Sequence, residues 1–161
     1  MKTLTLFITV LLNALATGFF FVWSVSVILG TKKTGDLTYL ETMQSINKEI
    51  LNPAFFIVFF GSLITLLITT YMQFNYKPMF WFVLISALTY LIGTFGITAF
   101  GNVPLNNELE ALNLDKLDIT QLKNFRNYYE SKWNLYHTLR TIASMTSFIL
   151  LLVAIFIKKQ F

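Results

Sequence analysis

The residues best suited to chemistry lie on one stripe of a helix near the end of the chain. Trp133, His137 and Arg140 are separated by four and three positions, which places their side chains on one helical face. His137 is the only histidine in the sequence, and an imidazole exchanges a proton near neutral pH. Arg140 could stabilise an oxygen that becomes negative during a reaction. His137 and Arg140 are therefore our candidate catalytic residues.

Two further groups of polar residues are candidates for ligand binding. Gln44 and Asn47 lie in the connection after the first apolar segment, and Asn102 and Asn106 follow the third. We expect residues 101–108 to form a loop at the membrane edge. Trp133 would complete the ligand-binding set.

Plainer roles for the same residues stay open. The asparagines could form turns and cap helix ends. His137 could simply tie the fourth helix to the 102–108 segment by hydrogen bonds. Arg140 could extend to the interface or pair with Glu108. In each case we expect a group between Asn102 and Glu108 to hydrogen-bond with His137 or Arg140.

The sequence predicts no metal site. It has no cysteine and one histidine, so a metal would depend on carboxylate or amide partners such as Glu108 or Glu130. Such a donor set is poor for iron, copper or zinc. Phosphate-binding loops, paired-histidine motifs and nucleophile elbows are also absent from the sequence. The cofactor is therefore unknown, and the sequence requires none.

Composition and patterning indicate an integral membrane protein. Of 161 residues, 55% are hydrophobic and 12% are charged, about half the charged fraction of a soluble domain. Apolar runs long enough to cross a bilayer cover about residues 3–29, 52–73, 79–100 and 134–157. We interpret residues 1–161 as a single membrane domain. The +4 charge flanks apolar runs, so the expected partner is the lipid bilayer and not nucleic acid.

The segments between the spans add two features to this all-α transmembrane four-helix bundle. Residues 36–51 carry apolar side chains at helical spacing, which predicts a short amphipathic helix. Asp118 and Gln121 form a loose capping box, and the pattern after them predicts one helix over residues 119–157. At 1.5 Å per residue this helix is about 55–60 Å long. Its first half must project out of the bilayer.

Charge favours a cytoplasmic location for both termini. Lys2, Lys77, Lys158 and Lys159 flank spans on the side of the termini, whereas the opposite side mixes basic residues with all the acidic ones. Lysines next to spans tend to remain in the cytoplasm. We therefore expect a multi-pass protein of the bacterial inner membrane, with residues 101–108 on the non-cytoplasmic face.

Several motifs resemble, in their order along the chain, those of the anthrone oxygenase-like family. The motifs are Gly18-Phe19-Phe20, residues 43–47 with Asn52-Pro53, residues 101–106, and Trp133, His137 and Arg140. The resemblance covers nearly the whole chain, and the Asn-Val-Pro-Leu-Asn segment is its most specific part. It implies a small four-helix membrane protein. In some fungal members it implies oxygenation of a polycyclic anthrone to an anthraquinone, and most bacterial members have no known substrate.

Two functions follow from these expectations. In the first, the protein binds or oxidises a small hydrophobic molecule, for example a polycyclic aromatic one, at its non-cytoplasmic face, and any enzyme activity is a cofactor-independent oxygenation with His137 as base. In the second, it is a non-enzymatic scaffold or accessory subunit, and the polar cluster is a structural latch. The sequence leaves the choice, and the oligomeric state, open.

Overall fold

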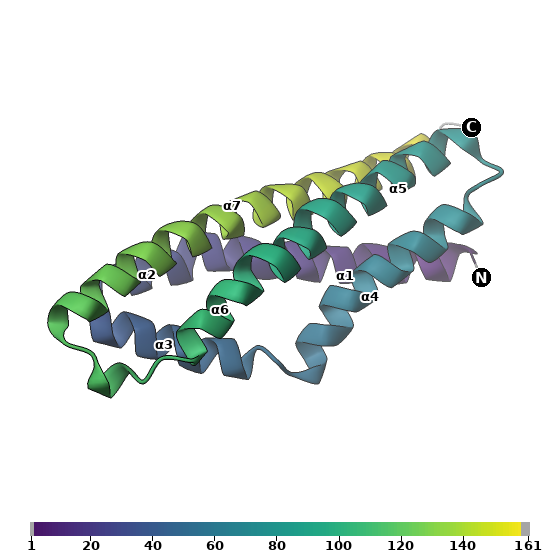
Figure 1. The fold of residues 1–161 in the computed structure, drawn as a ribbon. Helices are drawn as coiled ribbons and strands as arrows, with labels where there is room; N and C mark the ends of the chain where they lie inside the picture. The colour runs from purple at the N-terminus through teal and green to yellow at the C-terminus, as the bar shows by residue number, and fades with distance from the viewer. Residues whose placement is uncertain (1, 159–161) are drawn as a thin grey trace.

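The computed structural model describes residues 2–158, and all elements within that range are helical (Figure 1). The elements are α1 (Lys2–Val22), η1 (Trp23–Val27), α2 (Ile28–Thr31), α3 (Asp36–Glu49), α4 (Pro53–Met72), α5 (Lys77–Thr89), η2 (Tyr90–Gly96), η3 (Thr98–Asn102), α6 (Val103–Glu110), the 3-10 turn η4 (Leu114–Lys116) and α7 (Ile119–Lys158). Within the described residues these elements, other than α3 and η4, form four long continuous helical stretches, which we call rods. The first rod combines α1, the π-helical segment η1 and α2, and the third combines α5, the π-helical segments η2 and η3, and α6.

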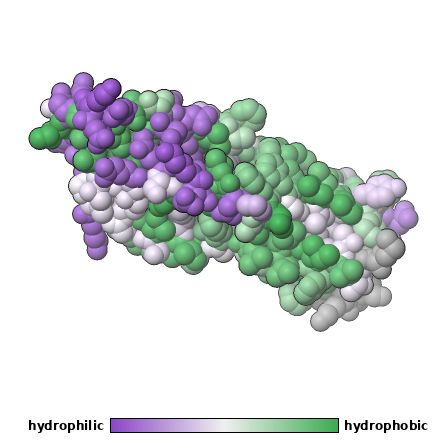
Figure 2. Space-filling view, turned by 90° about the horizontal axis from the view of Figure 1, so that it is seen from below, coloured by the Kyte–Doolittle hydropathy of each residue, from purple (hydrophilic) through white to green (hydrophobic). Residues whose placement is uncertain are grey.

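The predicted fold class is confirmed: the chain is a multi-pass integral membrane protein built as a helical bundle. Four helical stretches are long and apolar enough to cross a membrane: Thr3–Thr31, Pro53–Met72, Lys77–Glu110 and Ile119–Ile157. Figure 2 shows hydrophobic residues over most of the molecule's length and hydrophilic residues gathered at one end. Figure 1 shows that this polar end carries α3 and α6, whereas both ends of the described chain lie at the opposite end.

Helix starts and lengths follow from local signals. Asn52 caps α4 by accepting a hydrogen bond from the Phe55 N–H through Oδ1 at 3.0 Å, and Pro53 occupies the first turn. At the start of α7, Asp118 and Gln121 exchange side-chain and backbone hydrogen bonds at 2.8 and 3.0 Å. The predicted long fourth helix is therefore confirmed. Its 40 residues span about 60 Å, roughly twice the hydrocarbon thickness.

The expected break and loop at residues 101–108 are wrong, because the third rod continues as helix to Glu110. A Cβ on Gly101 would lie 2.9–3.1 Å from the ring of Tyr136, so this glycine permits close packing on α7 and does not end the helix. Pro104, which cannot donate a backbone hydrogen bond, lies in the first turn of α6, just after the π-helical segment η3, and the helix continues through it. The polar residues of this segment therefore project from a helix.

Small hydroxyl residues join the helices within the apolar part. Ser86 of α5 and Ser147 of α7 each donate to the other's backbone carbonyl, at 2.7 and 2.9 Å. The hydroxyls of Thr17 and Ser144 lie 2.9 Å apart and join α1 to α7. Such contacts allow close approach of backbones and satisfy polar groups where water is scarce.

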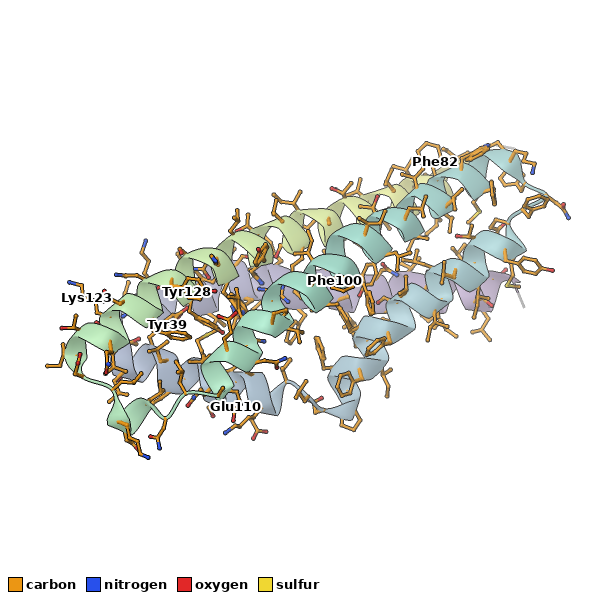
Figure 3. The ribbon with its side chains drawn as sticks, in the orientation of Figure 1. Tyr39, Phe82, Phe100, Glu110, Lys123 and Tyr128 are labelled. Atoms are coloured by element: carbon orange, nitrogen blue, oxygen red, sulfur yellow. The ribbon has the colours of Figure 1, made fainter. Side chains whose placement is uncertain are left out.

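Arg126 fastens the polar end of the molecule. Its guanidinium donates to Asp36 Oδ1 at 3.0 Å, to Glu130 Oε2 at 2.9 Å and to the Thr34 carbonyl at 2.7 Å. The guanidinium also lies 4.5 Å from the centre of the Tyr39 ring, which Figure 3 shows between α3 and α7. Burial, followed by the Glu130 carboxylate, raises the pKa of Tyr39, which therefore stays a neutral phenol. These contacts fix α3 against the projecting half of α7.

The side chains that carried the topology prediction lie mostly outside the described part of the molecule. Residue 159 is not described, and Lys2 and Lys158 are described only as backbone. The cytoplasmic location of the termini therefore stays a prediction.

Candidate functional site

A cavity of about 340 Å³ lies between η1, the end of α3, the η3–α6 segment and α7. Its walls include the aromatic side chains of Phe19, Phe20 and Trp23, and its polar lining includes Asn47, Asn102, Asn106, Trp133, His137 and Arg140. We call this space the polar cavity. Its size falls within the range of small-molecule sites, which combine apolar walls with a few polar groups.

The site lies near one edge of the apolar region. The stretch of α7 from His137 to Lys158 is about 30 Å long at 1.5 Å per residue, which matches the hydrocarbon thickness. Arg126, which pairs with Asp36 and Glu130, lies further along the projecting half of α7. The polar cavity therefore lies near one end of the apolar part of α7.

Arg140 is buried, and all its hydrogen bonds within the described residues go to neutral acceptors. It donates to His137 Nδ1 from Nε at 3.3 Å and from one terminal nitrogen at 3.1 Å, and to Thr98 Oγ1 at 3.3 Å. The guanidinium carbon lies 4.9 Å from the ring centre of Phe20 and 5.1 Å from that of Trp133. No described carboxylate forms an ion pair with it. A buried charge usually has such a partner.

His137 is fully buried and held from every side. Its ring stacks on Trp133, with centroids 5.1 Å apart and an interplanar angle of 7°. Its Nε2 lies 2.9 Å from Ser24 Oγ and 3.3 Å from Thr141 Oγ1. Because Arg140 can only donate, Nδ1 must accept. This arrangement assigns the proton of a neutral ring to Nε2, which faces Ser24.

The asparagines of the third rod contact Trp133 and Tyr129. The Asn106 Oδ1 atom accepts from Trp133 Nε1 at 2.8 Å and from the Tyr129 hydroxyl at 3.1 Å. Asn102 donates through Nδ2 to the Trp133 carbonyl at 3.1 Å. Asn47 of α3 donates to the Tyr129 hydroxyl at 3.3 Å. These hydrogen bonds, which we call the asparagine latch, join α3 and the η3–α6 segment to α7.

The expected hydrogen bond from residues 102–108 to His137 or Arg140 is wrong for the described chain. Asn102 and Asn106 contact α7 one or two turns earlier, at Trp133 and Tyr129. The possible pairing of Arg140 with Glu108 is also wrong, because Glu108 Oε2 accepts from the Tyr128 hydroxyl at 3.0 Å instead. Since α6 is a helix, its side chains cannot fold back toward Arg140 as a loop could.

Gln44 alone among the candidate binding residues lies away from the polar cavity. Its Nε2 donates to the carbonyls of Leu109 and Leu112 at 2.9 and 3.2 Å, so it caps the end of α6. The other candidates all line the polar cavity. Tyr90 does not line the polar cavity: it is buried and donates to the Phe59 carbonyl at 3.1 Å.

Sequence reasoning missed four partners of the site: Ser24, Thr98, Tyr129 and Thr141. Ser24 and Thr98 lie in largely apolar segments, where such residues usually bond to their own helix. Both also do so here, through the Phe20 and Thr94 carbonyls at 3.2 and 2.7 Å. A useful signal was that Tyr129 shares the stripe of Trp133 and His137 at four-residue spacing.

Within the side chains that the structure describes, no group of three or more His, Cys, Asp or Glu residues could hold a metal ion. The polar cavity instead offers the Arg140 guanidinium, an imidazole and carboxamides, and its lining also includes the ion pair of Lys48 with Glu110 at 2.9 Å. Such groups bind and orient oxygen atoms of a ligand through hydrogen bonds.

Comparison with known proteins identifies a family. Residues 53–150 match the family model described as Anthrone oxygenase. The matched region begins at the start of α4 and includes η3, α6 and the α7 residues that line the polar cavity. No curated protein and no solved structure matches the chain.

Proposed function

Because this chain belongs to the anthrone oxygenase family, we propose that its polar cavity binds a flat aromatic molecule and oxygenates it without a cofactor. The observation that carries the proposal is the position of Arg140. Its buried guanidinium borders a cavity with aromatic walls and makes its described hydrogen bonds only to neutral groups. A group of this kind favours a ligand on which negative charge develops.

The reaction converts a methylene group between two aromatic rings into a ketone. Loss of one proton leaves a carbanion. Its charge spreads through the rings to the oxygen of the substrate's own ketone group, which gives an enolate. Molecular oxygen takes up the electrons and binds the carbon, and the proton completes a hydroperoxide. Loss of water then leaves the ketone, so one oxygen atom enters the product and the other enters water.

Within this scheme Arg140 stabilises the enolate oxygen, and His137 positions Arg140. The Nδ1 lone pair of His137 accepts hydrogen bonds from the guanidinium. In this arrangement it is not free to accept a proton from a substrate. A substrate whose anion is stabilised by Arg140 ionises more readily. The proton can then leave to water at the membrane edge, or to His137 once ligand binding draws Arg140 away.

The test is anthrone turnover by the protein in lipid nanodiscs, followed as oxygen consumption and anthraquinone absorption. Wild-type protein and a Lys123→Gln variant should accelerate the reaction over empty nanodiscs, since Lys123 is exposed on the projecting part of α7. Arg140→Gln should reduce the rate at least about 100-fold, the typical effect of losing an oxyanion donor. Mass spectrometry should detect a copurified aromatic molecule. The absence of both turnover and a bound aromatic molecule would contradict the proposal.

The asparagine latch favours a second candidate function. Asn106 accepts two hydrogen bonds that hold α6 to α7, and Asn47 adds α3 to the same network. A non-enzymatic scaffold would need this rigidity and no ligand. The two functions differ in one measurable way. In a scaffold, substitutions of Arg140 would change the stability or assembly of the protein, whereas in a ligand-binding protein they would also change the affinity for the ligand.

A further inference from the structure

The guanidinium of Arg140 has hydrogen-bonding capacity left over. A guanidinium carries five N–H groups, and those of Arg140 reach only His137 Nδ1 and Thr98 Oγ1 within the described chain. At least one N–H on each terminal nitrogen is therefore without an acceptor. Because the side chain is only 8% exposed, these groups have little access to water. They favour an oxygen atom, and most of all a negatively charged one.

A free acceptor on a residue that lines the same cavity complements these free donors. The Oδ1 atom of Asn102 is buried and has no hydrogen-bond partner among the described residues. Its orientation is fixed, because the Nδ2 group of the same amide donates to the Trp133 carbonyl. Asn102 is 1% exposed and lines the polar cavity. An unpaired buried acceptor is costly, and a hydroxyl group of a ligand would satisfy it.

An apolar cavity lies beside the site, between α1 and α4. A second cavity of about 320 Å³ shares Phe19, Phe20, Ile50 and Phe55 with the polar cavity, and Ala16 and Ala54 contribute to its other walls. We call it the lateral cavity. The Phe19 side chain at the shared wall is 42% exposed, on the surface that faces lipid. A ligand that spans both cavities would thus be hydrophobic along most of its length.

We propose that the ligand is a membrane-dissolved hydroxyaromatic acid held as its anion. Its ionised oxygen binds Arg140, a neighbouring hydroxyl donates to Asn102 Oδ1, and its apolar body extends into the lateral cavity. This inference rests on the proposed function, since it names the ligand class of the same site. It adds that the site selects the ionised form before any reaction, and that the bilayer supplies the ligand.

The test uses 1,2-dihydroxyanthraquinone, whose visible absorption changes when a hydroxyl ionises, with wild-type protein in nanodiscs of neutral phosphatidylcholine. Its 1,2-dimethoxy ether serves as a probe that cannot ionise. Wild-type protein should move the midpoint of the colour change at least about one pH unit lower than in empty nanodiscs, which equals a tenfold preference for the anion. Arg140→Gln should abolish the shift, and it should weaken binding of the ionised probe more than binding of the ether. Lys123→Gln should retain the shift.

The alternative outcomes separate the two levels of the argument. If both probes bind and the wild-type midpoint equals that of empty nanodiscs, the anion inference fails and the proposed function stands. If neither probe binds to a protein that retains its helical circular dichroism, both fail. Palmitate, an acid without rings, tests the aromatic class. Tighter binding of palmitate than of 1,2-dihydroxyanthraquinone would overturn it.

Discussion

The Arg140 guanidinium donates to His137 Nδ1 from two nitrogens, at 3.3 and 3.1 Å. This contact joins two groups that both carry positive charge when protonated, and no described carboxylate forms an ion pair with either of them. It is favourable only when the imidazole is neutral and Nδ1 is the acceptor. The pair therefore presents one positive charge to the polar cavity, and that charge is on Arg140.

The first prediction concerns the tautomer of His137. Because His137 is the only histidine in the chain, protein labelled with ¹⁵N-histidine gives signals from a single imidazole. At pH 7 we expect a neutral ring with the proton on Nε2 and an unprotonated Nδ1. The physical reason is that Nδ1 faces a donor-only group, whereas Nε2 faces the Ser24 hydroxyl at 2.9 Å. Solid-state NMR of the protein in lipid distinguishes the two nitrogens directly.

Substitution of Arg140 provides the control for this assignment. Arg140→Gln removes the guanidinium, so the imidazole should show a mixture of tautomers or titrate freely. Ser24→Ala should leave Nδ1 unprotonated, because the Arg140 contact is intact. A protonated Nδ1 at pH 7 in the wild-type protein would contradict the described contact and, with it, the positioning role of His137.

The second prediction compares adjacent asparagines. Asn106→Ala removes the acceptor shared by Trp133 Nε1 and the Tyr129 hydroxyl. It should lower the free energy of unfolding by about 1–3 kcal/mol, the typical cost of leaving buried donors unpaired. Asn107→Ala is the matched control, since Asn107 is exposed and its side chain has no described hydrogen bond. Reversible denaturation in mixed micelles measures both, and equal effects would argue against the asparagine latch.

The extent of sequence prediction differed between elements for physical reasons. The long apolar runs and the Asn52–Pro53 start of α4 were sufficient to predict the membrane helices. Gly101 and Pro104 suggested a break, because local propensity does not record that the Tyr136 ring packs on the glycine. The helix therefore continues at a glycine that packs against Tyr136 of α7, a residue distant in the sequence.

The site was predictable to the level of one helical face. Spacing alone placed His137 and Arg140 together, and the structure has them in direct contact. Their partners Ser24 and Thr98 come from other helices and carry common hydroxyl side chains. Identifying them required the relative rotation of the helices, which a single sequence does not specify.

The third prediction concerns orientation in the membrane. Because the chain has no cysteine, one introduced thiol reports one position. Asn75→Cys lies between α4 and α5, on the side of the termini, and Asn113→Cys lies between α6 and η4. We expect a membrane-impermeant maleimide to label Asn113→Cys in cells with a permeable outer membrane and an intact inner one, and Asn75→Cys only after lysis. The opposite pattern would place the polar cavity on the cytoplasmic face.

The last prediction tests whether the ligand reaches into the lateral cavity. Ala54 lines that cavity from the first turn of α4, and its side chain is exposed, so a larger residue fills space without displacing the core. Ala54→Trp should weaken binding of the three-ring probe 1,2-dihydroxyanthraquinone about tenfold, because the indole occupies volume that the distant ring needs. It should leave binding of the one-ring probe 1,2-dihydroxybenzene unchanged, since the polar groups around Arg140 are untouched. Ala111→Trp, at an exposed alanine outside both cavities, should affect neither probe. Equal weakening of both probes by Ala54→Trp would show that the substitution distorts the polar cavity, and no weakening of either would place the apolar body elsewhere.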